Sequence, residues 1–128
     1  MYPDDRRYTR EHEWAKREGT RVRIGVTSFA AERLSDVVFI ELPKVGAQLR
    51  ATEAFGVIES VKAASDLFAP MSGRVAEVNQ GLIDNPEVIN QDPHGAAWMI
   101  VVEPANDAEW DHLLDAEAYG KLVGAEGE

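Results

Sequence analysis

Short stretches that contain apolar and often β-branched residues recur among polar positions along this chain, a pattern typical of β-strands. Gly, Pro and Asn residues separate these stretches, and such residues favour turns. We expect strands at residues 14–17, 21–26, 37–42, 55–58, 63–69, 74–79 and 98–102. Glu18-Gly19 is a plausible tight turn between the first two strands. Short strands that recur at this spacing are typical of a β-sandwich.

One early segment changes to the helical period. Thr27 or Ser28 is placed to cap a short helix over residues 29–34, in which Ala30 and Leu34 share a face. The segment is long enough for about two turns. A brief helix is therefore expected inside a chain that is otherwise rich in strands.

The last quarter of the chain also has helical spacing. Asn106 followed by Glu109 forms a capping-box pattern, and Asp115 is placed to cap a further helical segment around Tyr119. We expect a polar tail at residues 124–128. Loops are expected at residues 85–86 and 91–95.

Strands followed by a helix predict an α+β fold that is mainly β. We expect one domain over residues 1–128, with a core at about 8–123 and flexible termini. The formal net charge of −10 repels phosphate backbones and anionic membrane surfaces, so neither nucleic acid nor membrane is an expected partner. Basic proteins are favoured instead, and we expect the chain to be a monomer on its own.

The composition also bounds the chemistry. The chain has no cysteine, which excludes disulfides, thiolate metal sites and a cysteine nucleophile. No apolar run is long enough to cross a bilayer, and no transit peptide is recognisable. We therefore expect a cytoplasmic protein, or a mitochondrial-matrix protein if the source is eukaryotic.

The residues that carry chemistry in enzymes do not form a recognised catalytic pattern here. His12, His94 and His112 are far apart, and none has metal-ligand spacing, so no metal site is expected. Ser60-Val61-Lys62 has the wrong spacing for a serine–lysine pair. Lys62 is also a poor nucleophile, because a lysine needs burial or a neighbouring cation to lower its pKa from about 10.4.

Val61-Lys62 nevertheless breaks a local rule. The pair lies between two expected strands, where a two-residue hairpin loop prefers Gly, Asn or Asp with positive φ. A β-branched Val61 resists that conformation, so the loop either adopts an unprimed turn or is longer. Small neighbours leave Lys62 as the one long side chain at the tip, where another protein can approach it closely.

Residues 59–66, Glu-Ser-Val-Lys-Ala-Ala-Ser-Asp, resemble the lipoyl-attachment motif of the glycine cleavage system H protein family. The resemblance covers roughly residues 8–122. Further matching segments, in order along the chain, are residues 8–14, 25–27, 36–43, 69–73, 77–79, 90–93 and 113–116.

This resemblance implies a barrel-sandwich hybrid with a short internal helix and a C-terminal helix, and Lys62 at a hairpin tip. It implies lipoate in amide linkage on Lys62, which makes the chain a non-catalytic carrier. The attachment motif comprises Lys62 with Glu59, Ser60, Val61, Ala63 and Asp66. Glu13 and Val26, with Asp66, match the surface on which the family shelters its loaded arm.

The implied partners are four enzymes. A pyridoxal-phosphate glycine decarboxylase loads an aminomethyl group, and an aminomethyltransferase passes its carbon to tetrahydrofolate. A dihydrolipoyl dehydrogenase reoxidises the arm, and a lipoate-attaching enzyme installs it. The chemistry then belongs to the arm and the partners, which agrees with the lack of a catalytic pattern in this chain.

The sequence departs from the family pattern around the short helix. Ser28-Phe29-Ala30-Ala31 replaces an acidic residue, His or Tyr, and Ala-Gln, while Ser35 replaces a usual Gly and His94 a usual Tyr. These differences are either neutral or mark a changed pocket or partner.

Two other functions remain open. The first is a related carrier role: a protein that relays lipoate to other lipoyl domains, a biotinyl domain or a lipoyl domain of a dehydrogenase complex. Methionines usually flank a biotinyl lysine, whereas Val61 and Ala63 flank Lys62, and the chain is larger than a minimal lipoyl module. The second is a small enzyme that uses His12 with Glu13.

Overall fold

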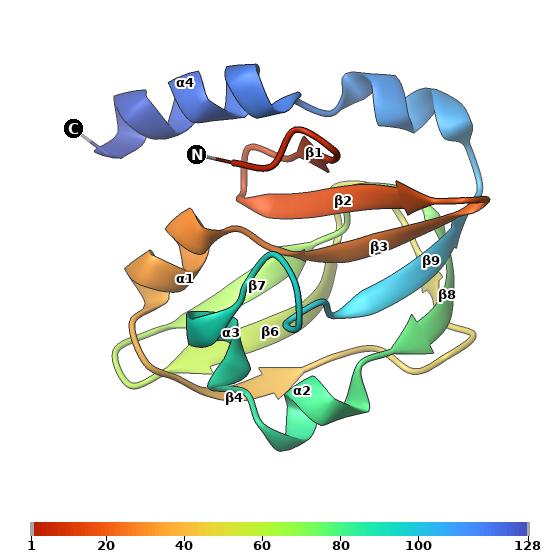
Figure 1. Cartoon of the computed structure of the whole chain (residues 1–128). Helices are drawn as coiled ribbons and strands as arrows, with labels where there is room; N and C mark the ends of the chain where they lie inside the picture. Colours follow the sequence, from red (N-terminus) through yellow and green to blue (C-terminus); the bar gives the residue numbers. More distant parts are fainter. Residues whose placement is uncertain (1, 128) are drawn as a thin grey trace.

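The computed structural model describes residues 2–127 and consists of two antiparallel sheets with short helices around them (Figure 1). The larger sheet has the strand order β1-β2-β3-β9-β8-β5 and the smaller one β4-β6-β7. The strands are β1 (Arg7–Tyr8), β2 (Glu13–Glu18), β3 (Arg21–Val26), β4 (Val37–Glu41), β5 (Gln48–Leu49), β6 (Ala54–Ser60), β7 (Ala64–Phe68), β8 (Gly73–Val78) and β9 (Ile100–Pro104). The helices are α1 (Ser28–Leu34), α2 (Gln80–Asp84), α3 (Val88–Gln91), the 3₁₀ helix η1 (Asp107–His112) and α4 (Ala116–Gly127).

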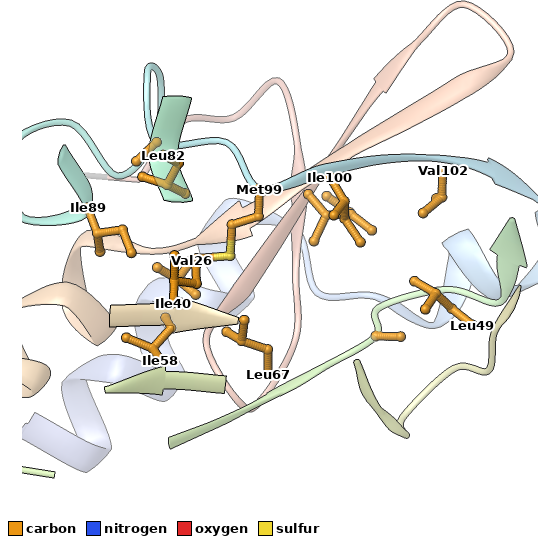
Figure 2. Packing of buried hydrophobic residues seen from close by; sticks show 14 of the residues in the cluster. Val26, Ile40, Leu49, Ile58, Leu67, Leu82, Ile89, Met99, Ile100 and Val102 are labelled. Carbon is orange, nitrogen blue, oxygen red and sulfur yellow. The ribbon is translucent and has the colours of Figure 1, made fainter. Parts of the chain in front are cut away.

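The core fills the space between the two sheets (Figure 2). Ile40 and Ile58 are register partners on β4 and β6, and both are buried. Ile24 of β3 and Ile100 of β9 pair in the same way in the larger sheet. Since side chains alternate between the faces of a strand, each sheet gives one apolar face to this core.

A second cluster fixes the C-terminal helix to the start of the chain. Tyr8, Trp14 and Tyr119 are each almost fully buried, and the rings of Tyr8 and Tyr119 stack with centroids 4.6 Å apart. Tyr8 and Leu114 exchange two backbone hydrogen bonds of 2.8 Å. As a result, α4 lies across β1 on one side of the molecule (Figure 1).

The prediction of a mainly β protein with a short internal helix and a C-terminal helix is confirmed, although the two sheets do not close into a barrel. Thr27 is the N-cap of α1, and its side chain accepts a hydrogen bond from the N–H of Ala30. Gly19 makes the predicted turn with φ of 65°. Within residues 2–127, no helix combines the length and apolar character needed to cross a membrane.

Residues 80–91 differ from the prediction. The loops expected at residues 85–86 and 91–95 are present apart from Gln91, but the two helices beside them, α2 (Gln80–Asp84) and α3 (Val88–Gln91), were not predicted. Leu82 and Ile89 are buried and cover one end of the core (Figure 2). Two helices of five and four residues are too short for a 3.6-residue period to show in the sequence.

The C-terminal predictions were correct in part. Asn106 caps the next segment through the N–H of Ala108, but that segment is a 3₁₀ helix and Glu109 does not complete a capping box. The Glu109 carboxylate accepts hydrogen bonds from the N–H and the hydroxyl of Ser72 instead. Asp115 caps α4 through the N–H of Ala118, as expected. The expected tail at 124–128 is wrong over its described part, because α4 continues to Gly127.

Candidate functional site

The tip between β6 and β7 is a tight turn that the side chain of Ser60 stabilises. The N–H of Ser60 donates to the carbonyl of Ala63 over 2.8 Å, which closes the turn. The hydroxyl of Ser60 accepts hydrogen bonds from the N–H of Lys62 at 3.3 Å and of Ala63 at 3.1 Å, and also donates to the Ala63 carbonyl. Neither Val61 nor Lys62 has a positive φ. The turn is therefore unprimed. It is stabilised by hydrogen bonds to the hydroxyl of Ser60, and does not use the Asn-Gly pair with positive φ that is usual in two-residue hairpin loops.

This turn leaves the amine of Lys62 free for modification. Lys62 is exposed and makes no ion pair within 4.0 Å with any carboxylate of residues 2–127. The N–H of Val61 donates to the carbonyl of Asp36 over 3.0 Å, which ties the tip to the residue before β4. The lysine therefore projects from a fixed support rather than from a loose loop.

A cleft of about 280 Å³ lies beside this tip, between α1 and β7. The predicted shelter residues Glu13, Val26 and Asp66 all line it, although they are far apart in sequence. Of the predicted attachment motif, Ala63 and Asp66 line the cleft, whereas Glu59, Ser60 and Val61 do not. The remaining lining residues are Glu11, His12, Ala30, Arg33, Leu34, Ile58, Ala64, Ser65 and Leu67.

Glu13 is the buried carboxyl group of this cleft. Its residue is only 2% exposed, and its two oxygens accept hydrogen bonds from the hydroxyl of Thr9 at 2.5 Å and the N–H of Phe68 at 3.1 Å. Burial raises the pKa of Glu13 to about 7, and these hydrogen bonds oppose that rise. The site thus holds a carboxyl group that exchanges its proton near neutral pH.

His12 lines the same cleft but does not bind Glu13. Its Nδ1 atom lies 2.7 Å from the hydroxyl of Tyr119, and its Nε2 atom lies 3.2 Å from a carboxylate oxygen of Glu126. The Tyr119 hydroxyl also contacts the hydroxyl of Thr27 at 2.7 Å. The two residues of the enzyme alternative, His12 and Glu13, therefore have separate partners, and His12 links α4 to the cleft.

The departures from the family pattern lie around α1. Ala31 is buried in the core, and the ring of Phe29 lies 4.7 Å from the ring of His12. Ser35 ends α1 with φ of 65° and ψ of −147°, a conformation that glycine adopts far more readily. Ser28 and His94, far apart in sequence, are hydrogen-bonded to each other. Of α1, the residues Ala30, Arg33 and Leu34 line the cleft, whereas Ser28, Phe29, Ala31, Ser35 and His94 do not.

Three contributors to the cleft were not recognised in the sequence: Thr9 and Phe68, which bind Glu13, and Tyr119, which binds His12. Tyr119 was expected only as an apolar helix residue. The Phe68 contact uses a backbone N–H, which no side-chain pattern reveals. Thr9 lies four residues before Glu13, a separation that permits contact only because the chain turns at residues 10–12.

Comparisons with known proteins agree with this geometry. The family model described as glycine cleavage H-protein matches residues 6–126. The chain belongs to this family. It is 56% identical over 128 residues to the glycine cleavage system H protein of Carboxydothermus hydrogenoformans, an alignment that covers 100% of this chain and 98% of the relative. It is 55% identical to that of Geobacillus sp. strain WCH70 over 121 residues, covering 94% and 95%.

A solved structure supports the same conclusion. The crystal structure of a glycine cleavage system H protein from Mycobacterium marinum is similar, with a TM-score of 0.87 and 41% identity. The similarity covers 99% of this chain and 100% of that one. The predicted family, the barrel-sandwich hybrid and the predicted role as a non-catalytic lipoyl carrier of glycine cleavage are therefore confirmed.

Proposed function

We propose that Lys62 is the residue that carries lipoate, in amide linkage, and that this chain thereby serves glycine cleavage. The observation that carries the proposal is the position of Lys62, exposed and unpaired at a stabilised hairpin tip beside a cleft. An attaching enzyme needs access to the amine of Lys62. The attached lipoyl arm also needs a nearby surface against which it can bind when it is loaded. Lipoate would supply the disulfide that accepts the aminomethyl group and the dithiol that is later reoxidised.

The lining of the cleft suits both the hydrocarbon part of the lipoyl arm and the amine that the loaded arm carries. Its walls are apolar where Val26, Leu34 and Leu67 line it, which suits a hydrocarbon arm. Glu13 adds a carboxyl group, which suits an amine. A cationic amine beside Glu13 favours the carboxylate form, and so offsets the desolvation that raises the pKa of this group. Glu13, Val26 and Asp66 are thus proposed to shelter the loaded arm.

The proposed partners follow from this role. Lys62 with its arm would serve a pyridoxal-phosphate glycine decarboxylase, then an aminomethyltransferase and then a dihydrolipoyl dehydrogenase, after a lipoate-attaching enzyme has modified it. Protein binding is in keeping with the charge of −10 and with the exposed tip. We further propose a cytoplasmic location, in keeping with its bacterial relatives.

Intact mass spectrometry tests the attachment site. The wild-type chain and a Lys62→Arg variant, which keeps the positive charge, are incubated with a lipoate-attaching enzyme, lipoate and ATP. We expect one lipoyl group on the wild type and none on the variant. An unmodified wild type, or a modified variant, would contradict the proposal.

Reconstitution with the decarboxylase and glycine then separates a glycine-cleavage carrier from a protein that only relays lipoate. We expect the lipoylated chain to support exchange of labelled carbon dioxide into glycine. A chain that accepts lipoate and yet supports no exchange would be a relay protein, and the proposed role would be wrong.

A further inference from the structure

The outer face of the smaller sheet carries a distinctive set of side chains. In the β4–β6–β7 register, Phe39, Glu59 and Ala64 form one row across the three strands. Glu41, Val57 and Asp66 form the next row. The inner face is identified by the buried pair of Ile40 and Ile58, so these two rows point outward. The Lys62 hairpin is the end of this same sheet.

Exposed apolar side chains concentrate at this face. Among the described residues, the large exposed hydrophobic side chains are Val38, Phe39, Val45 and Val61, at 54%, 49%, 59% and 69% exposure. Three of the four lie close together: Val38 and Phe39 are on β4, and Val61 is at the hairpin tip. The tip is held next to β4 because the N–H of Val61 donates to the carbonyl of Asp36, the residue before that strand. β4 is also an edge strand of its sheet. An apolar patch that continues to a modified lysine indicates a protein contact.

The charges on the two sheets differ. On the larger sheet Arg21, Arg23 and Arg74 are paired with glutamates, at 3.3 Å for Arg21 with Glu77, 2.9 Å for Arg23 with Glu18 and 3.0 Å for Arg74 with Glu103. The strands β4, β6 and β7 contain no lysine or arginine.

Four carboxylates at the smaller sheet have no such partner. Within the described chain, none is in an ion pair within 4.0 Å. They are Asp36, Glu41, Glu59 and Asp66. This face therefore presents uncompensated negative charge around an apolar patch, and a matching partner presents cations around an apolar recess.

We propose that this outer face, centred on Phe39, is the docking surface for the glycine-decarboxylating partner. The proposal rests on the proposed function. Acylation of Lys62 removes the one cation of the tip, so the face is most negative when the arm is attached and carries no amine. Loading the arm with an amine returns a positive charge to this end of the molecule.

This charge cycle favours the loading enzyme as the occupant. A cationic partner surface binds the unloaded, oxidised carrier more strongly than the loaded carrier. The loading enzyme requires this preference, because the unloaded carrier is its substrate and the loaded carrier is the product that it must release. A second copy of this chain is disfavoured on the same surface, because two negative faces repel each other.

The test compares matched variants, all fully lipoylated, in glycine-dependent carbon dioxide exchange with the decarboxylase at varied carrier concentration. Phe39→Thr removes the aromatic group, and Val45→Thr removes an exposed apolar group outside the sheet face. Glu41→Lys reverses a charge on the face. Glu117→Lys makes the same change of net charge on α4, which lies across the molecule from β4 (Figure 1).

We expect Phe39→Thr and Glu41→Lys each to raise KM for the carrier by about tenfold, since central aromatic and charged contacts dominate interfaces. We expect kcat to stay unchanged, because neither residue touches the arm. Val45→Thr and Glu117→Lys should leave both constants close to wild type. Added salt should raise KM for wild type more than for Glu41→Lys.

The possible contrary results are distinguishable. If the wild type supports exchange but Phe39→Thr and Val45→Thr have equal KM values, the proposed docking face is wrong and the proposed function still holds. Equal effects of Glu41→Lys and Glu117→Lys would show attraction by overall charge instead of a local face. Slower reoxidation by the dehydrogenase with unchanged exchange would assign the face to that enzyme and overturn our assignment. No exchange by wild type would contradict the proposed function itself.

Discussion

The backbone N–H of Ser28 donates a 3.2 Å hydrogen bond to the Nε2 atom of His94. The bond joins the first residue of α1 to a loop 66 positions away in the sequence. An Nε2 atom that accepts a hydrogen bond is unprotonated, so the neutral ring carries its proton on Nδ1. His94 therefore caps an N–H that the start of a helix leaves free.

His94 makes the free energy of unfolding depend on pH in the mildly acidic range. Burial of the ring, together with the nearby guanidinium of Arg6, lowers the pKa of His94 below its ordinary 6.5, and the carboxylates of Asp92 and Asp5 oppose this shift. As pH falls through about 6.5, the unfolded chain takes up a proton on this residue before the folded chain does. Folding stability from His94 is present at higher pH and declines in this window.

A His94→Gln variant keeps an acceptor for the Ser28 N–H but cannot titrate. We expect it to lose less stability than wild type between pH 7.5 and pH 5.5, measured by urea unfolding. The same loss in both chains would show that His94 does not cause the pH dependence.

Ser35 stores backbone strain at the end of α1. Its φ of 65° and ψ of −147° lie in a region that is accessible almost only to glycine, and Asn90 holds it there by donating its side-chain N–H to the Ser35 carbonyl over 2.6 Å. We expect Ser35→Gly to raise the free energy of unfolding by about 1 kcal/mol, after the entropy that glycine adds to the unfolded chain.

Chemical unfolding measures this effect, with Ser65→Gly in β7 as the matched control. Ser65 has no positive φ, so the same exchange there should destabilise the protein by about 0.5–1 kcal/mol. Destabilisation by both variants would contradict the assigned strain.

The regular strands and α1 were predictable because their signals are local. The apolar faces of β3, β4 and β9 show in short windows of sequence, and Thr27 caps α1 by a short-range contact. The two-residue strands β1 and β5 were not predicted, since pairing with distant segments defines them. Glu109 was misassigned for a similar reason: its best donors belong to Ser72, which is 37 residues away.

The site shows the same division. Lys62 was identified by its motif, and the structure adds the Ser60 contacts that explain the turn. The pKa of Glu13 was not predictable from sequence, because it depends on burial by β7 and on the N–H of Phe68. Local chemistry identifies the attachment point, while the cleft beside it exists only after folding.

The Ser60 hydroxyl should control the rigidity of the tip. Ser60→Ala removes the acceptor for the N–H groups of Lys62 and Ala63, so we expect faster amide hydrogen exchange at these two residues. The free energy of unfolding should fall by only about 0.5–1 kcal/mol, because the bonds are exposed to water. Ser60→Thr keeps the hydroxyl and should retain slow exchange. Fast exchange in the wild type would contradict a rigid tip.

Glu13 links folding to pH in the opposite direction from His94. Burial raises its pKa to about 7 in the folded chain, from 4.5 in the ordinary state. As pH rises above 4.5, the unfolded chain releases this proton before the folded chain does. The stability that the protonated carboxyl group provides therefore declines from pH 4.5 to about pH 7 and is absent above that. The difference amounts to about 3 kcal/mol at most, by the usual conversion of pKa shifts into free energy.

A Glu13→Gln variant removes the titration and keeps an acceptor for the N–H of Phe68. Its stability relative to wild type should increase from pH 5 to pH 8, as measured by urea unfolding. Glu13→Ala is the control for packing, since it leaves Thr9 and Phe68 without their acceptor and should be destabilised at every pH. A constant difference between wild type and Glu13→Gln across this range would show that the cleft carboxyl group is already ionised at pH 5, and would remove the basis for a proton exchange near neutral pH.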